Sequence, residues 1–118
     1  MIHKLQEAFV KDNAVEWEQV EELIKRKIMS YDDKSMLVKV HFQKGGVGQI
    51  HSHYHCQTSY VESGSFEITI GNEVKLLKAS DVFYVAPNVF HGAVCLEEGI
   101  LLDFFSPLRE DFLSWNST

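Results

Sequence analysis

Residues 36–105 repeat one pattern, in which short stretches of alternating apolar and polar side chains end in residues that favour turns. Residues 36–43 and 66–70 alternate in this way, and Gly71-Asn72 is a tight hairpin signal. A period of two places successive side chains on opposite faces of a strand. Short strands spaced roughly 8–12 residues apart, with little helix, are typical of a sandwich or barrel. The sequence therefore predicts an all-β domain.

The pattern also predicts where single strands end. We expect turns at Gly64 and at residues 97–99, which would divide the apolar runs around them into separate short strands. Pro107 should end the last strand, because proline cannot donate to a ladder.

The N-terminal part is less regular. Trp17, Val20, Leu23 and Ile24 have helical spacing, which predicts a short amphipathic helix or turn. Residues 1–30 carry more apolar surface than a barrel needs, so we expect this segment to pack on the barrel or on the partner of a homodimer. Residues 31–113 would form the barrel, and residues 114–118 a tail.

Composition limits the kind of partner and compartment. The 118 residues suffice for one domain, and the net charge of −6 argues against a nucleic-acid partner. We find no apolar run of transmembrane length and no signal-peptide pattern, so we expect no membrane partner and a cytoplasmic protein. Cys56 and Cys95 would then be reduced, one facing away from the histidines and one in the core.

A cluster of imidazoles carries the chemistry. His51, His53, His55 and Gln57 all occupy odd positions, so on an extended strand they would share one face. Imidazole is the commonest metal ligand, and a further histidine, His91, follows a turn signal. The stretch therefore predicts a site for one divalent metal ion. Ni, Zn, Fe, Mn and Co all accept such ligands, and parity alone leaves His55 and Gln57 as competing candidates.

The spacing of these residues resembles the two motifs of the cupin superfamily. The first motif, G-x5-H-x-H-x3(or 4)-E-x6-G, is matched by Gly45, His51, His53 and Gly64, with Gln57 at the glutamate position. The second motif, G-x5-P-x-G-x2-H-x3-N, keeps its histidine as His91 and has Ser80, Ala86, Asn88 and Cys95 at its other places. Asn88 can adopt the left-handed conformation that glycine would supply. The resemblance implies a cupin double-stranded β-helix (jelly-roll) barrel with a short N-terminal helix or turn segment.

A narrower resemblance covers roughly residues 15–113. The stretches HSHYHCQTSYVESG and LLDFFSPLREDFL look like the pectin-degradation-protein cupins of the KdgF type, from which Cys56 and Ala86 depart. That family implies an enzyme acting late in pectin and alginate breakdown, which converts 4,5-unsaturated uronate monosaccharides into open-chain keto sugars. The small-molecule partner would therefore be an anionic sugar.

The resemblance also implies roles for individual residues. The metal ligands would be His51, His53, Gln57 and His91, with Gln57 preferred over His55 by the cupin spacing. Asp103 would act as general acid or base, and Arg109 would bind the uronate carboxylate and assist catalysis. The substrate pocket would also include Phe105 and His55.

Two other functions stay open. Three histidines and one further ligand do not separate Lewis-acid from redox chemistry, so another cupin metal enzyme, such as a dioxygenase or a sugar isomerase or epimerase, is an alternative. A non-enzymatic sugar-binding cupin is the second. Oxygen consumption would identify the dioxygenase, and tight sugar binding without turnover would identify the binding protein.

Overall fold

The computed structural model describes residues 7–113, so the predicted tail at residues 114–118 lies outside the described residues. The chain forms strands almost throughout. In order, the elements are η1 (Asp12–Ala14), β1 (Glu18–Glu21), β2 (Ile24–Tyr31), β3 (Met36–Phe42), β4 (Val47–His51), β5 (Cys56–Ile70), β6 (Glu73–Lys78), β7 (Val82–Val85), β8 (His91–Ser106) and η2 (Glu110–Phe112). No helix in this part of the chain is long and apolar enough to cross a membrane.

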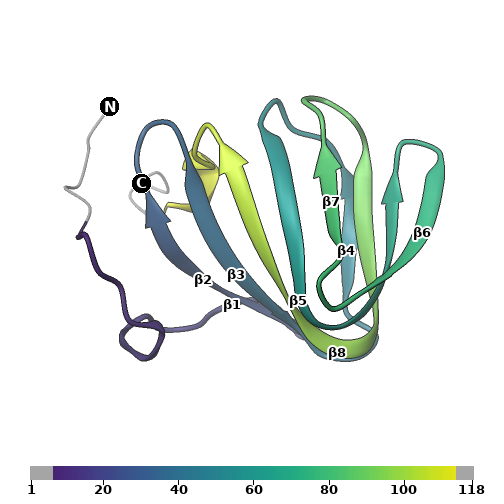
Figure 1. The fold of residues 1–118 in the computed structure, drawn as a ribbon, viewed down its shortest axis with the longest axis horizontal. Coiled ribbons are helices and arrows are strands. Elements are labelled where there is room, and N and C mark those ends of the chain that lie inside the picture. The colour runs from purple at the N-terminus through teal and green to yellow at the C-terminus, as the bar shows by residue number, and fades with distance from the viewer. Residues whose placement is uncertain (1–6, 114–118) are drawn as a thin grey trace.

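Two long strands, β5 and β8, organise the barrel. They pair antiparallel along almost their whole length, from Cys56 opposite Ser106 to Ile70 opposite His91. The first half of β5 and the second half of β8 lie in one sheet with β7, β3, β2 and β1. Their other halves lie in a second sheet with β6 and β4. Figure 1 shows both long strands curving at the closed end of the barrel, which confirms the predicted jelly-roll architecture.

The turns predicted at Gly64 and at residues 97–99 were wrong. β5 and β8 are continuous there, and bulges between Val61 and Phe66 bend the pair from one sheet into the other. Gly64 has a φ of +83°, and a methyl group on Gly99 would overlap the carbonyl of Ser63. A glycine inside a strand often marks a bulge or a close approach of two backbones. Gly64 and Gly99 mark such a close approach, at the point where β5 and β8 bend from one sheet into the other.

The helix predicted around residues 17–24 was wrong, and the alternative of a turn holds only for residues 22–23, between β1 and β2. That stretch forms β1 and the start of β2, and the only helical turn near it is the three-residue η1. Ile24 pairs with Phe42 on β3 and is buried, so pairing with the neighbouring strand overrides the helical spacing. The barrel sheet therefore begins at Glu18, well before the expected boundary at residue 31.

The N-terminal segment lies against the outer face of β2 and β3. The Asp12 carbonyl accepts a hydrogen bond of 2.8 Å from Lys27 Nζ, and its carboxylate pairs with Lys39 at 3.0 Å. The Lys39 and Lys27 ammonium groups hold the pKa of Asp12 below its usual value. Trp17 lies 4.7 Å from the ammonium of both Lys25 and Lys27. These contacts are on the outside of the barrel, so they do not reach its interior.

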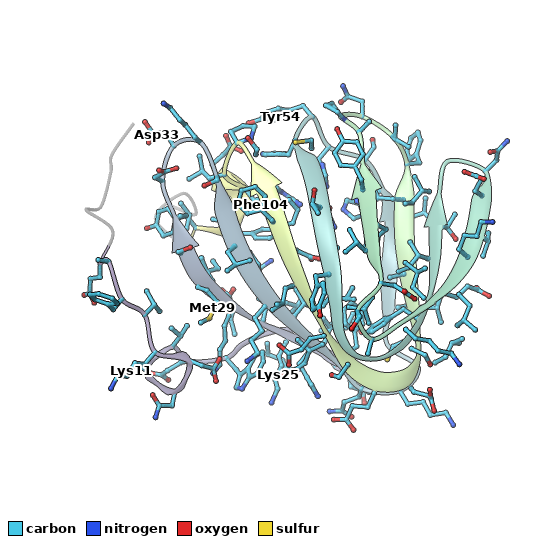
Figure 2. The ribbon with its side chains drawn as sticks, viewed as in Figure 1. Lys11, Lys25, Met29, Asp33, Tyr54 and Phe104 are labelled. Carbon is cyan, nitrogen blue, oxygen red and sulfur yellow. The ribbon has the colours of Figure 1, made fainter. Side chains whose placement is uncertain are left out.

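The interior holds two apolar clusters. The first comprises Ile24, Phe42, Val61, Phe66, Ile68, Phe83, Val85, Cys95 and Leu101. The second comprises Met36, Val38, Phe105, Leu108 and Leu113, and it joins β3 and β8 to the segment after Pro107. Side chains of opposite parity, such as Phe104, point outward from the same strands (Figure 2). The second cluster thereby fixes residues 107–113 against the barrel beside the histidines.

Candidate metal centre and its cavity

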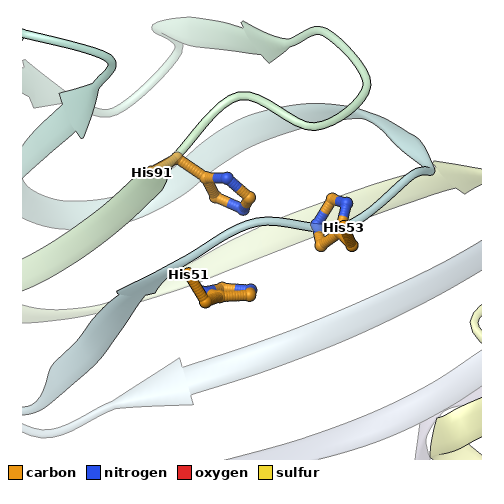
Figure 3. Close-up of side chains that lie close together, drawn as sticks. All are labelled: His51, His53 and His91. Atoms are coloured by element: carbon orange, nitrogen blue, oxygen red, sulfur yellow. The ribbon is translucent and has the colours of Figure 1, made fainter.

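Three histidines from two strands and one loop meet inside the barrel. His51 ends β4, His91 begins β8 and lies opposite it in the ladder, and His53 lies in the loop between β4 and β5. Their rings face one another in Figure 3. One nitrogen from each ring lies within 4.8 Å of the others, which is close enough for one ion to bind all three. Residues 51–57 are therefore not one strand, as the parity argument assumed, but a strand end, a loop and a strand start.

The backbone fixes which nitrogen each imidazole offers. In all three rings Nδ1 is paired with a backbone carbonyl: His51 with Gln49 at 2.8 Å, His53 with His55 at 3.0 Å and His91 with Val89 at 2.9 Å. Nδ1–H donates in such a contact, so the lone pair is on Nε2. The Nε2 atom of His91 is buried and has no hydrogen-bond partner in the described structure. A divalent cation would satisfy it, so these residues fit a metal.

Burial favours the neutral form of two of the imidazoles, His53 and His91. It lowers the pKa of His91 to about 4 and, together with the nearby Arg109 charge, lowers that of His53. A metal ligand must offer an unprotonated nitrogen. His53 and His91 can therefore offer a cation unprotonated nitrogens at neutral pH without first releasing protons.

Gln57 is held with its oxygen toward the histidines. Its Nε2 donates to Ser59 Oγ at 2.9 Å, and its Oε1 lies 3.1 Å from Nε2 of His53. Because His53 uses its Nδ1 proton on a carbonyl, this contact brings two lone pairs together. A shared cation would relieve that repulsion, so Gln57 is a candidate fourth ligand.

Asp103 is linked to this glutamine through one hydroxyl. Ser59 and Asp103 are direct partners across β5 and β8, and Ser59 Oγ donates to Asp103 Oδ1 at 2.6 Å. Burial raises the pKa of Asp103 to about 6, although the Ser59 hydrogen bond and the Arg109 charge both act to lower it. A carboxyl group with such a pKa can both accept and donate a proton near neutral pH.

Arg109 covers the same region from the segment after β8. Its Nε and Nη2 bind both carboxylate oxygens of Asp111, at 3.0 and 2.9 Å. Its guanidinium lies 5.1 Å from the Phe105 ring centroid and 4.2 Å from that of Phe112. These contacts hold an almost fully buried cation beside the histidines.

A cavity of about 250 Å³ joins these groups. Its walls include His51, His91, Gln57, Asp103, Phe105 and Arg109. Pockets for drug-sized ligands measure about 300–1,000 Å³, so this cavity suits a smaller molecule. Sequence reasoning missed one charged wall residue, Arg26, which lies two residues after the core residue Ile24 on β2.

His55 lies elsewhere. Its Nε2 is 3.1 Å from Glu110 Oε1, and the Tyr54 ring stacks on it with centroids 4.0 Å apart. The Tyr54 hydroxyl donates to the same carboxylate at 2.8 Å. His55 is not among the residues that line the cavity. It connects the histidine loop to η2, and its expected contact with substrate stays a prediction.

Known proteins identify the family. The sequence-family model for the cupin domain matches residues 38–105 of this chain. The chain is 47% identical over 104 residues to pectin degradation protein KdgF of Dickeya dadantii (strain 3937), a match that covers 86% of this chain and 94% of that protein. This chain is a cupin of the KdgF family.

Solved cupin structures agree with the fold. An RmlC-like cupin from Shewanella frigidimarina NCIMB 400 has a TM-score of 0.90 and 42% identity, covering 96% of this chain and 100% of that one. KdgF from Halomonas sp. has a TM-score of 0.87 and 38% identity, covering 90% and 100%.

The cupin motifs also explain two unusual backbone positions. Ser80 and Asn88 occupy places where the second motif has glycine, and their φ angles are +80° and +67°. The conformation predicted for Asn88 is confirmed. Its backbone N–H donates to the His53 carbonyl at 2.7 Å, so this turn ties the loop of His53 to the strand that carries His91.

Proposed function

We propose that this cupin is a metal-dependent enzyme that opens the ring of 4,5-unsaturated uronate monosaccharides from pectin or alginate breakdown. The observation that carries the proposal is one small cavity that brings together a cluster of imidazole nitrogens, a carboxyl group of raised pKa and a buried guanidinium. Membership of the KdgF family supports the substrate class, because the relative from Dickeya dadantii is named for pectin degradation.

The cation would be held by His51, His53 and His91 through Nε2 and by Gln57 through Oε1. All four groups are neutral, so they leave the full charge on the ion. Ni, Zn, Fe, Mn and Co are all compatible with this donor set. When bound, the metal supplies Lewis acidity that polarises a substrate oxygen.

The other cavity residues would bind and orient the sugar. Arg109 binds Asp111 through Nε and Nη2, which leaves the N–H groups of Nη1 unused in this pairing. These N–H groups can donate to the uronate carboxylate. Phe105 supplies an apolar wall against the sugar ring and, with Phe112, excludes water from the guanidinium.

Asp103 would move the proton. The substrate is a cyclic enol ether with a hemiacetal at C1. When Asp103 takes the proton of the C1 hydroxyl, the C1–O5 bond breaks, an aldehyde forms at C1, and the electron pair stays on O5 as an enolate. Return of the proton to C4 then gives the C5 ketone. Substrate and product are isomers, so one carboxyl group of pKa about 6 can serve both transfers.

Unsaturated galacturonate provides the test, because its conjugated double bond absorbs in the ultraviolet. Protein loaded with each of the five metals in turn should accelerate the loss of this absorbance, and a chelator should abolish the effect. If no metal form accelerates the loss, the proposal is refuted. Oxygen uptake during the assay would instead favour a dioxygenase.

Two further properties belong to this proposal. A homodimer that uses residues 1–30 would cover the exposed side chain of Phe9, which is 89% accessible. A cytoplasmic location would suit an enzyme that acts on monosaccharides at the end of polysaccharide breakdown. Sedimentation and cell fractionation would check them.

A further inference from the structure

A second guanidinium, that of Arg26, lines the cavity. Arg26 lies on β2, in the sheet that contains β3 and the second half of β8. His51 and His91 come from the pairing of β4 with the first half of β8, and they line the same cavity as Arg26. Its side chain is only 18% exposed.

Phe112 brings the two arginines together. The Arg26 guanidinium carbon lies 3.9 Å from the ring centroid of Phe112, and that of Arg109 lies 4.2 Å from the same centroid. The two guanidinium carbons are therefore no more than about 8 Å apart. One monosaccharide can contact both.

The two arginines differ in the donors they have left. A guanidinium has five N–H groups, and its paired edges each match a carboxylate. Arg109 uses its Nε/Nη2 edge on Asp111. Arg26 donates only through Nε, to Glu18 Oε1 at 2.7 Å, and makes no other hydrogen bond within residues 7–113. Its Nη1/Nη2 edge is thus available.

We infer that Arg26 is a specificity-determining residue that binds the carboxylate of an acid sugar through Nη1 and Nη2, beside the remaining donors of Arg109. Glu18 orients Arg26 from the solvent side, and stacking on Phe112 holds the guanidinium plane. The cavity would then select uronates over neutral sugars. The identity of the sugar rests on the proposed function, but the preference for a carboxylate can be measured without turnover.

Calorimetric titration of the nickel-loaded protein with galacturonate and with galactose tests this inference. Both sugars are saturated and lack the double bond that the proposed reaction consumes. Arg26→Met should weaken galacturonate binding about 10- to 100-fold, the range for hydrogen bonds to a charged group. Arg26→Lys should lose less, because lysine keeps the charge without the fork. Galactose binding should change less than twofold in both variants.

Lys25→Met is the matched control. Lys25 neighbours Arg26 on β2 but faces outward against Trp17 (Figure 2), so this variant should bind galacturonate within twofold of the unmodified protein. Thermal unfolding of all three variants identifies any that fail to fold. If Arg26→Met does not fold, the comparison of Arg26→Lys with the unmodified protein still decides the question.

Three results would overturn the inference. The first is that the unmodified protein does not bind galacturonate, and the second is that the Arg26 variants bind galacturonate as tightly as the unmodified protein. The third is that the variants lose as much affinity for galactose as for galacturonate, which would mean that Arg26 only packs against Phe112. Failure of the proposed function is separate: unsaturated galacturonate would then persist while galacturonate binding still depended on Arg26.

Discussion

Replacing Asp103 with asparagine should stabilise the protein while it removes catalysis. Burial raises the pKa of Asp103 from 3.8 to about 6, so the folded state holds a proton that the unfolded state has already released between these values. The free energy of unfolding therefore falls as the pH rises from about 4 to about 6. A difference of about two pKa units corresponds to about 3 kcal/mol, at about 1.4 kcal/mol per unit. Asparagine carries no charge, and its amide oxygen can still accept a hydrogen bond from Ser59 Oγ. Asp103→Asn should therefore raise the free energy of unfolding by about 1–3 kcal/mol above pH 6 and leave it unchanged near pH 4.

Urea unfolding of the metal-free protein at pH 4, 5, 6 and 7.5 measures this difference directly. Asp111→Asn is the control with the opposite sign. Burial alone would raise the pKa of Asp111, but its hydrogen bonds and ion pair with Arg109 outweigh burial and lower it. Asp111→Asn should therefore lose stability at neutral pH. If the free energy of unfolding of Asp103→Asn differs from that of the unmodified protein by the same amount at pH 4 and at pH 7.5, the electrostatic reasoning is refuted.

The same variant tests the catalytic role in the metal-loaded protein. Loss of a positioned proton carrier should lower the rate of ultraviolet absorbance loss by about 10²- to 10⁴-fold. Full activity in Asp103→Asn would exclude Asp103 as the proton carrier and leave the substrate class open.

Other predictions concern the centre and its supports. His91→Ala should lower nickel affinity at least about 100-fold, measured by calorimetry, because it removes a proposed ligand whose tautomer is already fixed. Glu110→Gln weakens the contacts of η2 with Tyr54 and His55, so it should raise KM several-fold with nickel affinity unchanged; a lower nickel affinity would contradict this positioning role. Ser80→Gly should raise the free energy of unfolding by about 0.5–1 kcal/mol in thermal melts, because glycine adopts a φ of +80° without strain; a lower melting temperature would disprove this.

The sequence predicted the parts of the site that depend on fixed spacing along the chain. The alternation along β3 identified a half-buried strand, and the register of two motifs brought His91 to His51 and His53 across the barrel. The left-handed conformation of Asn88 followed from the steric preferences of one residue.

What the sequence could not predict depends on contacts between distant segments. Nothing local marks Gly64 and Gly99 as a close approach of two backbones rather than two turns. The cavity position of Arg26 depends on β1 and β2 joining the sheet, which the helical spacing around Trp17 obscured. The Glu110 partner of His55 could not be found from parity, because it comes from a segment that only the folded barrel brings near.

The long pairing of β5 with β8 sets when the centre can appear during folding. Gln57 pairs with Phe105 and Ser59 with Asp103. These residues meet only after the chain between the first half of β5 and the second half of β8 has closed into a long loop. Pairings of such sequence separation form slowly. No intermediate that lacks β8 can assemble the full set of proposed ligands, because His91 lies on β8. Capture of a metal by all four groups would therefore be a late event, and its appearance in time would report completion of the barrel.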